Sequence, residues 1–154
     1  MKKTKVRLTL CLVLLLLNLA LIWGSSLQTA EQSSKVSVTV AKPLAEAFPE
    51  GEFEAEGVGH AALRKTGHLT EFLALGLCTG WLACMLCPKD WQMLLLPLVC
   101  GTAVAALDEI IQLSVPGRSG QLSDVGIDVL GLCFGIVLIN IIRKRKLFFG
   151  GTKQ

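Results

Sequence analysis

Four long apolar runs alternate with polar or turn-forming segments along the chain, at residues 8–27, 68–87, 91–110 and 122–142. Each run is about 20 residues long, so as an α-helix it rises about 30 Å, which matches the hydrocarbon thickness of a bilayer. A helix satisfies its own backbone hydrogen bonds, as lipid requires. The pattern therefore predicts an all-α integral membrane protein, a four-transmembrane-helix bundle forming one domain over residues 1–154.

The first run allows two interpretations. It follows the basic residues Lys2, Lys3, Lys5 and Arg7, a pattern that also fits a cleaved signal peptide. The run is long, however, and the residues after it lack a convincing small-x-small cleavage site. We therefore predict a retained first transmembrane helix.

The connection between the second and third runs consists only of Pro88, Lys89 and Asp90. Such a short connection predicts that these two helices are antiparallel neighbours. Pro97 lies inside the third run, where it removes a backbone donor and is expected to kink the helix unless neighbouring groups compensate.

The distribution of basic residues predicts the orientation. With four spans and a cytoplasmic N-terminus, ten Lys and Arg residues lie inside and five outside, and basic residues near helix ends are enriched on the cytoplasmic side. The outer ones are Lys35, Lys42, Arg64, Lys65 and Arg118. Both termini are therefore predicted to be cytoplasmic, and the polar segment 28–67 with its acidic run Glu50, Glu52, Glu54 and Glu56 is predicted to be a solvated outer loop.

Composition supports the membrane assignment and excludes several functions. Apolar residues make up 52% of the chain, mean hydropathy is +0.59, and only 18% of residues are charged. No basic patch with interleaved aromatic residues indicates nucleic-acid binding. The six cysteines lie in or beside apolar runs, and Cys84 and Cys87 lack the second pair that would complete a metal site, so we expect reduced packing residues and neither a metal nor a cofactor.

The first polar group lies at the start of the second helix and contains Arg64, Lys65, His68 and Glu71. At about 100° per residue, Arg64, His68 and Glu71 share one helix face. The group is either part of a binding site or an interfacial cap that meets lipid headgroups.

The second polar group, Asp108, Glu109 and Gln112, closes the third helix. Carboxylates oppose the macrodipole at a helix C-terminus, so they need a partner. Arg118, in the turn after this helix, is the nearest cationic candidate. The structural alternative to a functional site is an ion pair that fixes the turn.

The third polar group, Asp124 and Asp128, opens the fourth helix. Asp124 suits an N-terminal cap, whereas Asp128 lies one turn deeper, where an ionised carboxylate is costly without a partner. Asp128 continues into a stripe with Gly131 and Gly135, and Gly76 and Gly80 repeat this small-xxx-small spacing in the second helix. Close packing between these two helices is predicted.

The predicted topology brings all three groups to the outer face, where they would form a polar binding site. The sequence contains no GxSxG, HExxH or phosphate-binding glycine loop, and a single His-x-x-Glu is not the signature of a di-metal helical bundle. Acid–base catalysis by Glu109 or His68 is the alternative to binding alone.

Four motifs follow one another in a specific order: a segment with serine and glutamine after the first helix, then Arg-Lys-x-x-His-x-x-Glu, then Asp-Glu-x-x-Gln with Pro-Gly-Arg, and finally an Asp-rich, Gly-xxx-Gly motif. In this sequence they are Ser25, Ser26, Gln28, Ser33 and Ser34; Arg64, Lys65, His68 and Glu71; Asp108, Glu109, Gln112, Pro116, Gly117 and Arg118; and Asp124, Asp128, Gly131 and Gly135. Together they resemble the VanZ-like family of bacterial membrane proteins over most of the chain. The chain departs from the pattern at Asp128, where the family usually has Asn; an ionised Asp128 would need Arg118 or His68 nearby, and a protonated one could donate as the amide does.

The resemblance implies a multi-pass protein of the bacterial plasma membrane. Some members of the family are associated with resistance to teicoplanin, a lipid-tailed glycopeptide that acts on cell-wall precursors at the outer membrane surface. Because Arg64, Lys65 and Arg118 converge with carboxylates and no nucleophile is recognisable, we predict a protein that binds a membrane lipid or lipid-linked cell-wall precursor headgroup. The resemblance adds a contribution to glycopeptide resistance as an expectation. The alternative is an intramembrane enzyme that modifies such a lipid.

Overall fold

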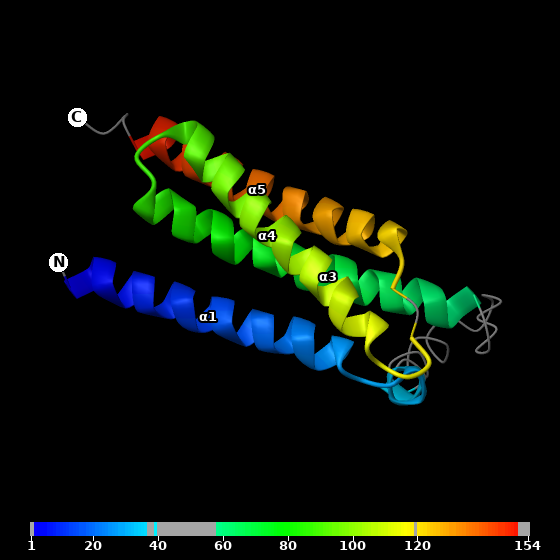
Figure 1. The fold of residues 1–154 in the computed structure, drawn as a ribbon. Coiled ribbons are helices and arrows are strands. Elements are labelled where there is room, and N and C mark those ends of the chain that lie inside the picture. The colour runs from blue at the N-terminus through cyan, green and yellow to red at the C-terminus, as the bar shows by residue number, and fades with distance from the viewer. Residues whose placement is uncertain (1, 37–38, 40–57, 119, 151–154) are drawn as a thin grey trace.

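The computed structural model describes residues 2–36, 39, 58–118 and 120–150. Over these ranges the chain forms four long helices and a short helical segment at residues 30–36, with no strand (Figure 1). The long helices are α1 (Lys2–Ser26), α3 (Val58–Leu86), α4 (Asp90–Leu113) and α5 (Leu122–Gly150). Each contains a segment long and apolar enough to cross a membrane, which confirms the predicted all-α fold with four spans.

Several helices extend beyond the apolar runs. Helix α3 begins at Val58, ten positions before the run predicted from residue 68, because residues 58–67 are rich in good helix formers. The run marks where the helix becomes apolar and not where it begins. Helix α4 continues through Pro97 to Leu113 without interruption. The acidic run at residues 50–56 lies outside the described residues.

The helices alternate in direction, which gives the bundle two different ends (Figure 1). At one, called here the terminal end, α1 begins, α5 finishes and a short connection joins α3 to α4. At the other, called here the loop end, α1 and α4 finish while α3 and α5 begin. Both chain termini therefore lie on the same side of the bundle, as an even number of spans requires; which side faces the cytoplasm remains a prediction.

Helices α3 and α5 form the most extensive contact in the bundle. Glycine makes this possible, because a Cβ added at Gly76 would overlap the backbone oxygen of Leu132, and one added at Gly135 would overlap that of Leu73. A Cβ added at Gly131 would likewise overlap a backbone oxygen, that of Leu69, whereas one added at Gly80 would meet the side chain of Ile139. The predicted close packing of the two glycine-containing helices is thus confirmed.

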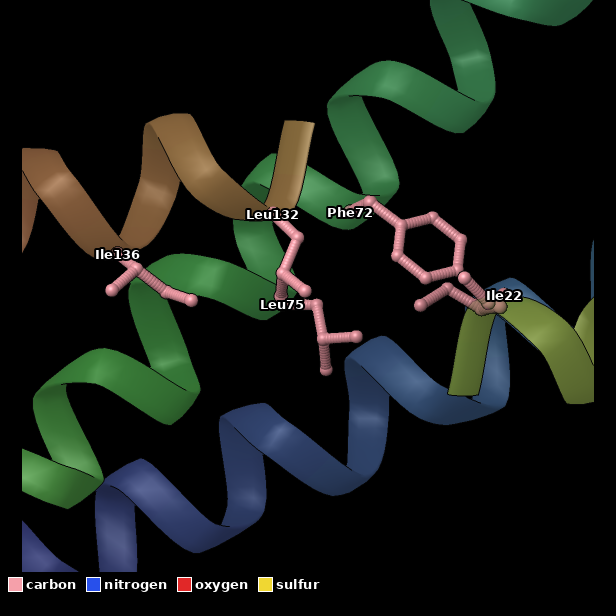
Figure 2. Close-up of a cluster of buried hydrophobic side chains, with 6 residues drawn as sticks. Ile22, Phe72, Leu75, Leu132 and Ile136 are labelled. Carbon is pink, nitrogen blue, oxygen red and sulfur yellow. The ribbon is translucent and has the colours of Figure 1, made fainter. Parts of the chain in front are cut away.

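A small apolar core connects all four long helices (Figure 2). It consists of Ile22, Phe72, Leu75, Ala105, Leu132 and Ile136. On α1, α4 and α5 many large apolar side chains point away from this core and are exposed, as expected for faces in contact with lipid, whereas Leu86 is the only such residue among those described on α3. Helix α3 is therefore the central helix, and His68 in its first half is buried.

Candidate functional site

The loop end brings together the polar groups of three helices, as predicted. Arg64, His68 and Glu71 come from α3, Asp108, Glu109 and Gln112 from α4, and Asp124 and Asp128 from α5. The end of α1 adds Ser25 and Ser26. Most of these side chains are buried, although all lie within about four turns of a helix end.

Arg64 and Asp124 join the starts of α3 and α5. A guanidinium nitrogen of Arg64 lies 2.7 Å from Asp124 Oδ2, and the carboxylate is almost fully buried. The sequence analysis placed Asp124 at the helix start but gave it no partner. The pair means that the positive charge of Arg64 is partly neutralised by protein.

Asp108 is held by two side chains from different helices. Ser26 Oγ donates to Asp108 Oδ1 at 2.6 Å, and Gln112 Nε2 donates to Asp108 Oδ2 at 3.0 Å. All three residues are fully buried. A hydroxyl and an amide therefore fix the orientation of this carboxylate, and Ser26 is a site residue that the sequence analysis noted only as part of a family motif.

His68 lies between two buried carboxylates. Its Nδ1 is 3.5 Å from Asp128 Oδ1 and 3.7 Å from Asp108 Oδ2. Asp128 is 0% exposed and His68 is 6% exposed. The sequence analysis considered Arg118 and His68 as partners of Asp128, and in the structure His68 is the one that lies beside it. These three residues are also the only described group of three or more His, Cys, Asp or Glu side chains close enough to share a metal ion.

Arg118 does not form the predicted ion pair with Asp108 or Glu109. Its guanidinium instead donates to the backbone oxygen of Ser25 at 3.0 Å, which ties the α4–α5 turn to the end of α1. Burial lowers the pKa of Arg118 from its ordinary value, and the positive charge of Arg64 lowers it further. An arginine remains cationic under these conditions, so two guanidinium groups lie near each other at the loop end.

Glu109 and Glu71 occupy different environments. Glu109 is buried, and its Oε2 accepts the backbone N–H of Gln121 at 2.8 Å, so it anchors the chain just before α5. Glu71 is half-buried and its Oε2 accepts a hydrogen bond from Ser25 Oγ at 3.3 Å. Only Glu71 lines the cavity described next.

A cavity of about 310 Å³ opens at the loop end between the start of α3, the end of α1 and the helical segment at 30–36. Four predicted site residues line it, namely Arg64, His68, Glu71 and Arg118, with Ser25, Gln28 and Ser33 as further polar groups and Val36 and Leu63 among the apolar ones. Asp108, Gln112, Asp124 and Asp128 are buried and lie outside this lining, and Lys65 is exposed and is not part of the lining either. The predicted set therefore separates into a cavity lining and a buried layer.

The six cysteines are all free thiols, Cys84 and Cys87 included. They lie along the spans, where Cys11 is buried and Cys100 is exposed on the outer face of α4. The packing role therefore stays a prediction, and none of the six thiols is among the cavity-lining residues at the loop end.

Comparison with known proteins identifies the family but no individual relative. A family model described as VanZ/LLP1 matches residues 10–143, which include all four apolar segments and every polar group at the loop end. Neither the curated proteins nor the solved structures contain a significant match to the chain. The family match and the four apolar helices agree with the resemblance carried by the motifs, and the chain belongs to the VanZ/LLP1 family of membrane proteins.

Proposed function

We propose that this protein binds the headgroup of an anionic lipid or lipid-linked cell-wall precursor in the loop-end cavity. The observation that carries the proposal is the presence of Arg64 and Arg118 in the lining of one cavity. Arg64 has a carboxylate partner, but among the described residues Arg118 donates only to a neutral backbone oxygen, and its buried Nε has no hydrogen-bond partner there. A buried unpaired donor costs free energy that a phosphate or carboxylate would recover.

The rest of the lining fits a headgroup attached to an apolar tail. Ser25, Gln28 and Ser33 offer donors and acceptors for hydroxyl groups, and Glu71 can accept from an amine or hydroxyl. Val36 and Leu63 provide apolar contact at the same cavity. The lipid-exposed faces of the neighbouring helices would allow an acyl or prenyl tail to remain in the bilayer while its headgroup enters.

The binding test uses purified full-length protein in nanodiscs of phosphatidylcholine, with phosphatidylglycerol or undecaprenyl pyrophosphate added as separate ligands. Losing one charge-assisted hydrogen bond costs about 1.5–3 kcal/mol, so Arg118→Gln is expected to weaken binding about 10- to 100-fold. Arg143→Gln at the terminal end is the matched control and should bind as the wild type does. Equal affinity of Arg118→Gln and wild type for both ligands would contradict the proposal, and the stronger ligand identifies the source of the headgroup.

We propose further that headgroup binding lowers the activity of teicoplanin by occupying its target or limiting access to it. Cells producing the wild-type protein should then tolerate more teicoplanin than cells producing Arg118→Gln at equal abundance. The experiment measures the minimal inhibitory concentration together with protein abundance in the membrane. Equal susceptibility at equal abundance would contradict the proposed role in resistance, whereas the proposal of lipid binding is decided by the binding test above.

A second candidate is an intramembrane enzyme that modifies such a lipid. One observation favours it: His68 lines the cavity while its ring faces two buried carboxylates, an arrangement that can orient an imidazole for general acid–base catalysis. Glu109, the other candidate base, lies outside the cavity lining and is bonded to the backbone of Gln121. Lipid mass spectrometry of membranes with wild-type protein, His68→Gln or no protein tests this candidate, and identical lipid profiles in all three would exclude it.

A further inference from the structure

Two carboxylates of the buried layer, Asp108 and Asp128, meet His68 of the cavity lining, and headgroup binding by Arg64 and Arg118 requires none of these three side chains. His68 of α3, Asp108 of α4 and Asp128 of α5 each offer one ligand atom, and these three atoms lie within 4.8 Å of one another. The sequence analysis placed these three residues in one polar site without expecting a metal, because it could not show that their ligand atoms lie so close together. We propose that these three side chains bind one divalent transition-metal cation.

The distances fit ligands of a common ion better than direct hydrogen bonds. His68 Nδ1 lies 3.5 Å from Asp128 Oδ1 and 3.7 Å from Asp108 Oδ2, which is longer than the 2.7–3.2 Å of an ordinary N–H···O bond. Two ligand atoms each about 2.1 Å from one ion, at a tetrahedral angle, lie about 3.4 Å apart. The observed spacing therefore resembles that of two ligands with an ion between them.

The polar atoms of the cluster also lack other partners. His68 Nδ1 and both carboxylate oxygens of Asp128 are buried and accept or donate no hydrogen bond. Asp128 is 0% exposed, and a protonated His68 at 3.5 Å would offset only part of the cost of removing its carboxylate from water. A cation bound to these atoms would remove that cost for both residues at once.

Asp108 already has the supporting contacts of a metal ligand. Ser26 Oγ donates to its Oδ1 at 2.6 Å and Gln112 Nε2 donates to its Oδ2 at 3.0 Å. Carboxylates that bind metals are commonly oriented by such hydrogen bonds from residues that do not touch the ion. Oδ2 retains a lone pair, because a carboxylate oxygen can accept more than one interaction.

The local charge balance points in the same direction. Around the cavity and the buried layer lie the carboxylates of Glu71, Asp108, Glu109, Asp124 and Asp128 and the guanidinium groups of Arg64 and Arg118, whereas Lys65 is exposed. Among the described residues, one ion pair joins these carboxylates to these guanidinium groups, between Arg64 and Asp124. One imidazole nitrogen with two carboxylates suits Mn²⁺, Fe²⁺, Co²⁺ or Zn²⁺ rather than a thiol-seeking ion such as Cu⁺. The remaining coordination positions would be available to water.

The test measures metal content in the purified full-length protein after dialysis against Zn²⁺ or Mn²⁺ and removal of free ions. Wild-type protein is expected to retain about one ion per chain, and Asp128→Asn at least tenfold less. Glu71→Gln is the matched control, because Glu71 is a nearby carboxylate outside the cluster, and it should retain the ion. Thermal unfolding of the wild type should shift upward with the bound metal and downward with a chelator, since a ligand that binds only the native state stabilises it.

Two outcomes would overturn the proposal. One is wild-type protein that retains less than a tenth of an equivalent of either metal. The other is Asp128→Asn protein that folds, by its unfolding transition, and retains metal as the wild type does. If Asp128→Asn does not fold, the unfolding transition of the wild type provides the test. A transition temperature that neither metal nor chelator changes would then overturn the proposal. Arg118→Gln should keep the ion, so a failure of lipid binding and a failure of metal binding are distinguishable.

Discussion

The two ends of the bundle carry charge in different ways. At the terminal end, Arg143 pairs with Asp90 at 2.6 Å, but Asp90 is 72% exposed. At the loop end, Arg64 pairs with Asp124 at 2.7 Å, and that carboxylate is almost fully buried. Ion pairs of nearly the same length therefore differ in strength, because water and salt screen the first pair more than the second.

The difference extends beyond the two pairs. The loop end also buries Asp108 and Asp128 completely, and it leaves polar atoms of Asp128 and His68 without partners. A protein that only needed to end its helices at the membrane surface could do so with exposed charges, as the terminal end does. The comparison teaches that the loop end is organised around buried polar groups, which is where ligand and metal sites are expected.

The largest expected effect concerns which side of the membrane each end of the bundle faces. In a variant without the six native cysteines, Ser123→Cys reports on the loop end and Lys144→Cys on the terminal end. Intact cells treated with a membrane-impermeant maleimide should label Ser123→Cys and leave Lys144→Cys unlabelled until the membrane is opened, because basic residues gather at the terminal end. Labelling of both sites in intact cells, or of Lys144→Cys alone, would contradict the predicted orientation.

The next largest effect tests the close contact between α3 and α5. Gly135→Leu should reduce the free energy of unfolding by about 3 kcal/mol, because its side chain must displace the backbone of α3. Gly126→Leu is the control on the same helix, since no atom lies within 4 Å of a Cβ added there. The measurement is unfolding of the purified protein in detergent, and equal stabilities of the two variants would refute the close helix contact.

A smaller effect is expected from breaking the buried ion pair. Asp124→Asn should cost about 2 kcal/mol, less than a fully buried pair because Arg64 is partly exposed. Asp90→Asn breaks the equivalent pair at the terminal end and should leave stability unchanged within error. If the two variants lost equal stability in the same unfolding assay, the contrast between the two ends would be wrong.

The smallest effect is expected from the hydroxyl that holds Asp108. Ser26→Ala removes one buried hydrogen bond and should cost about 1–2 kcal/mol of stability. Ser114→Ala, in the exposed turn after α4, should cost less, since its bond to Ile110 is long and exposed. A Ser26→Ala variant as stable as Ser114→Ala would mean that Asp108 needs no support from α1.

The sequence alone determined the features that depend on local pattern. The apolar runs were sufficient to place all four spans, because length and hydropathy decide whether a helix can cross a membrane. The glycine spacing predicted the contact of α3 with α5, since only glycine allows two backbones to approach so closely. Helical periodicity placed Arg64, His68 and Glu71 on one face, and all three line the cavity.

Only the tertiary structure decided which polar groups meet. Arg118 appeared to be the partner of the α4 carboxylates because it is nearest along the chain, yet it donates to Ser25 of α1. Asp108, His68 and Asp128 lie on three different helices, and their meeting depends on how those helices rotate and pack around the central one. Hydropathy and spacing constrain each helix separately, whereas partners across helices are set by packing, which one sequence does not specify.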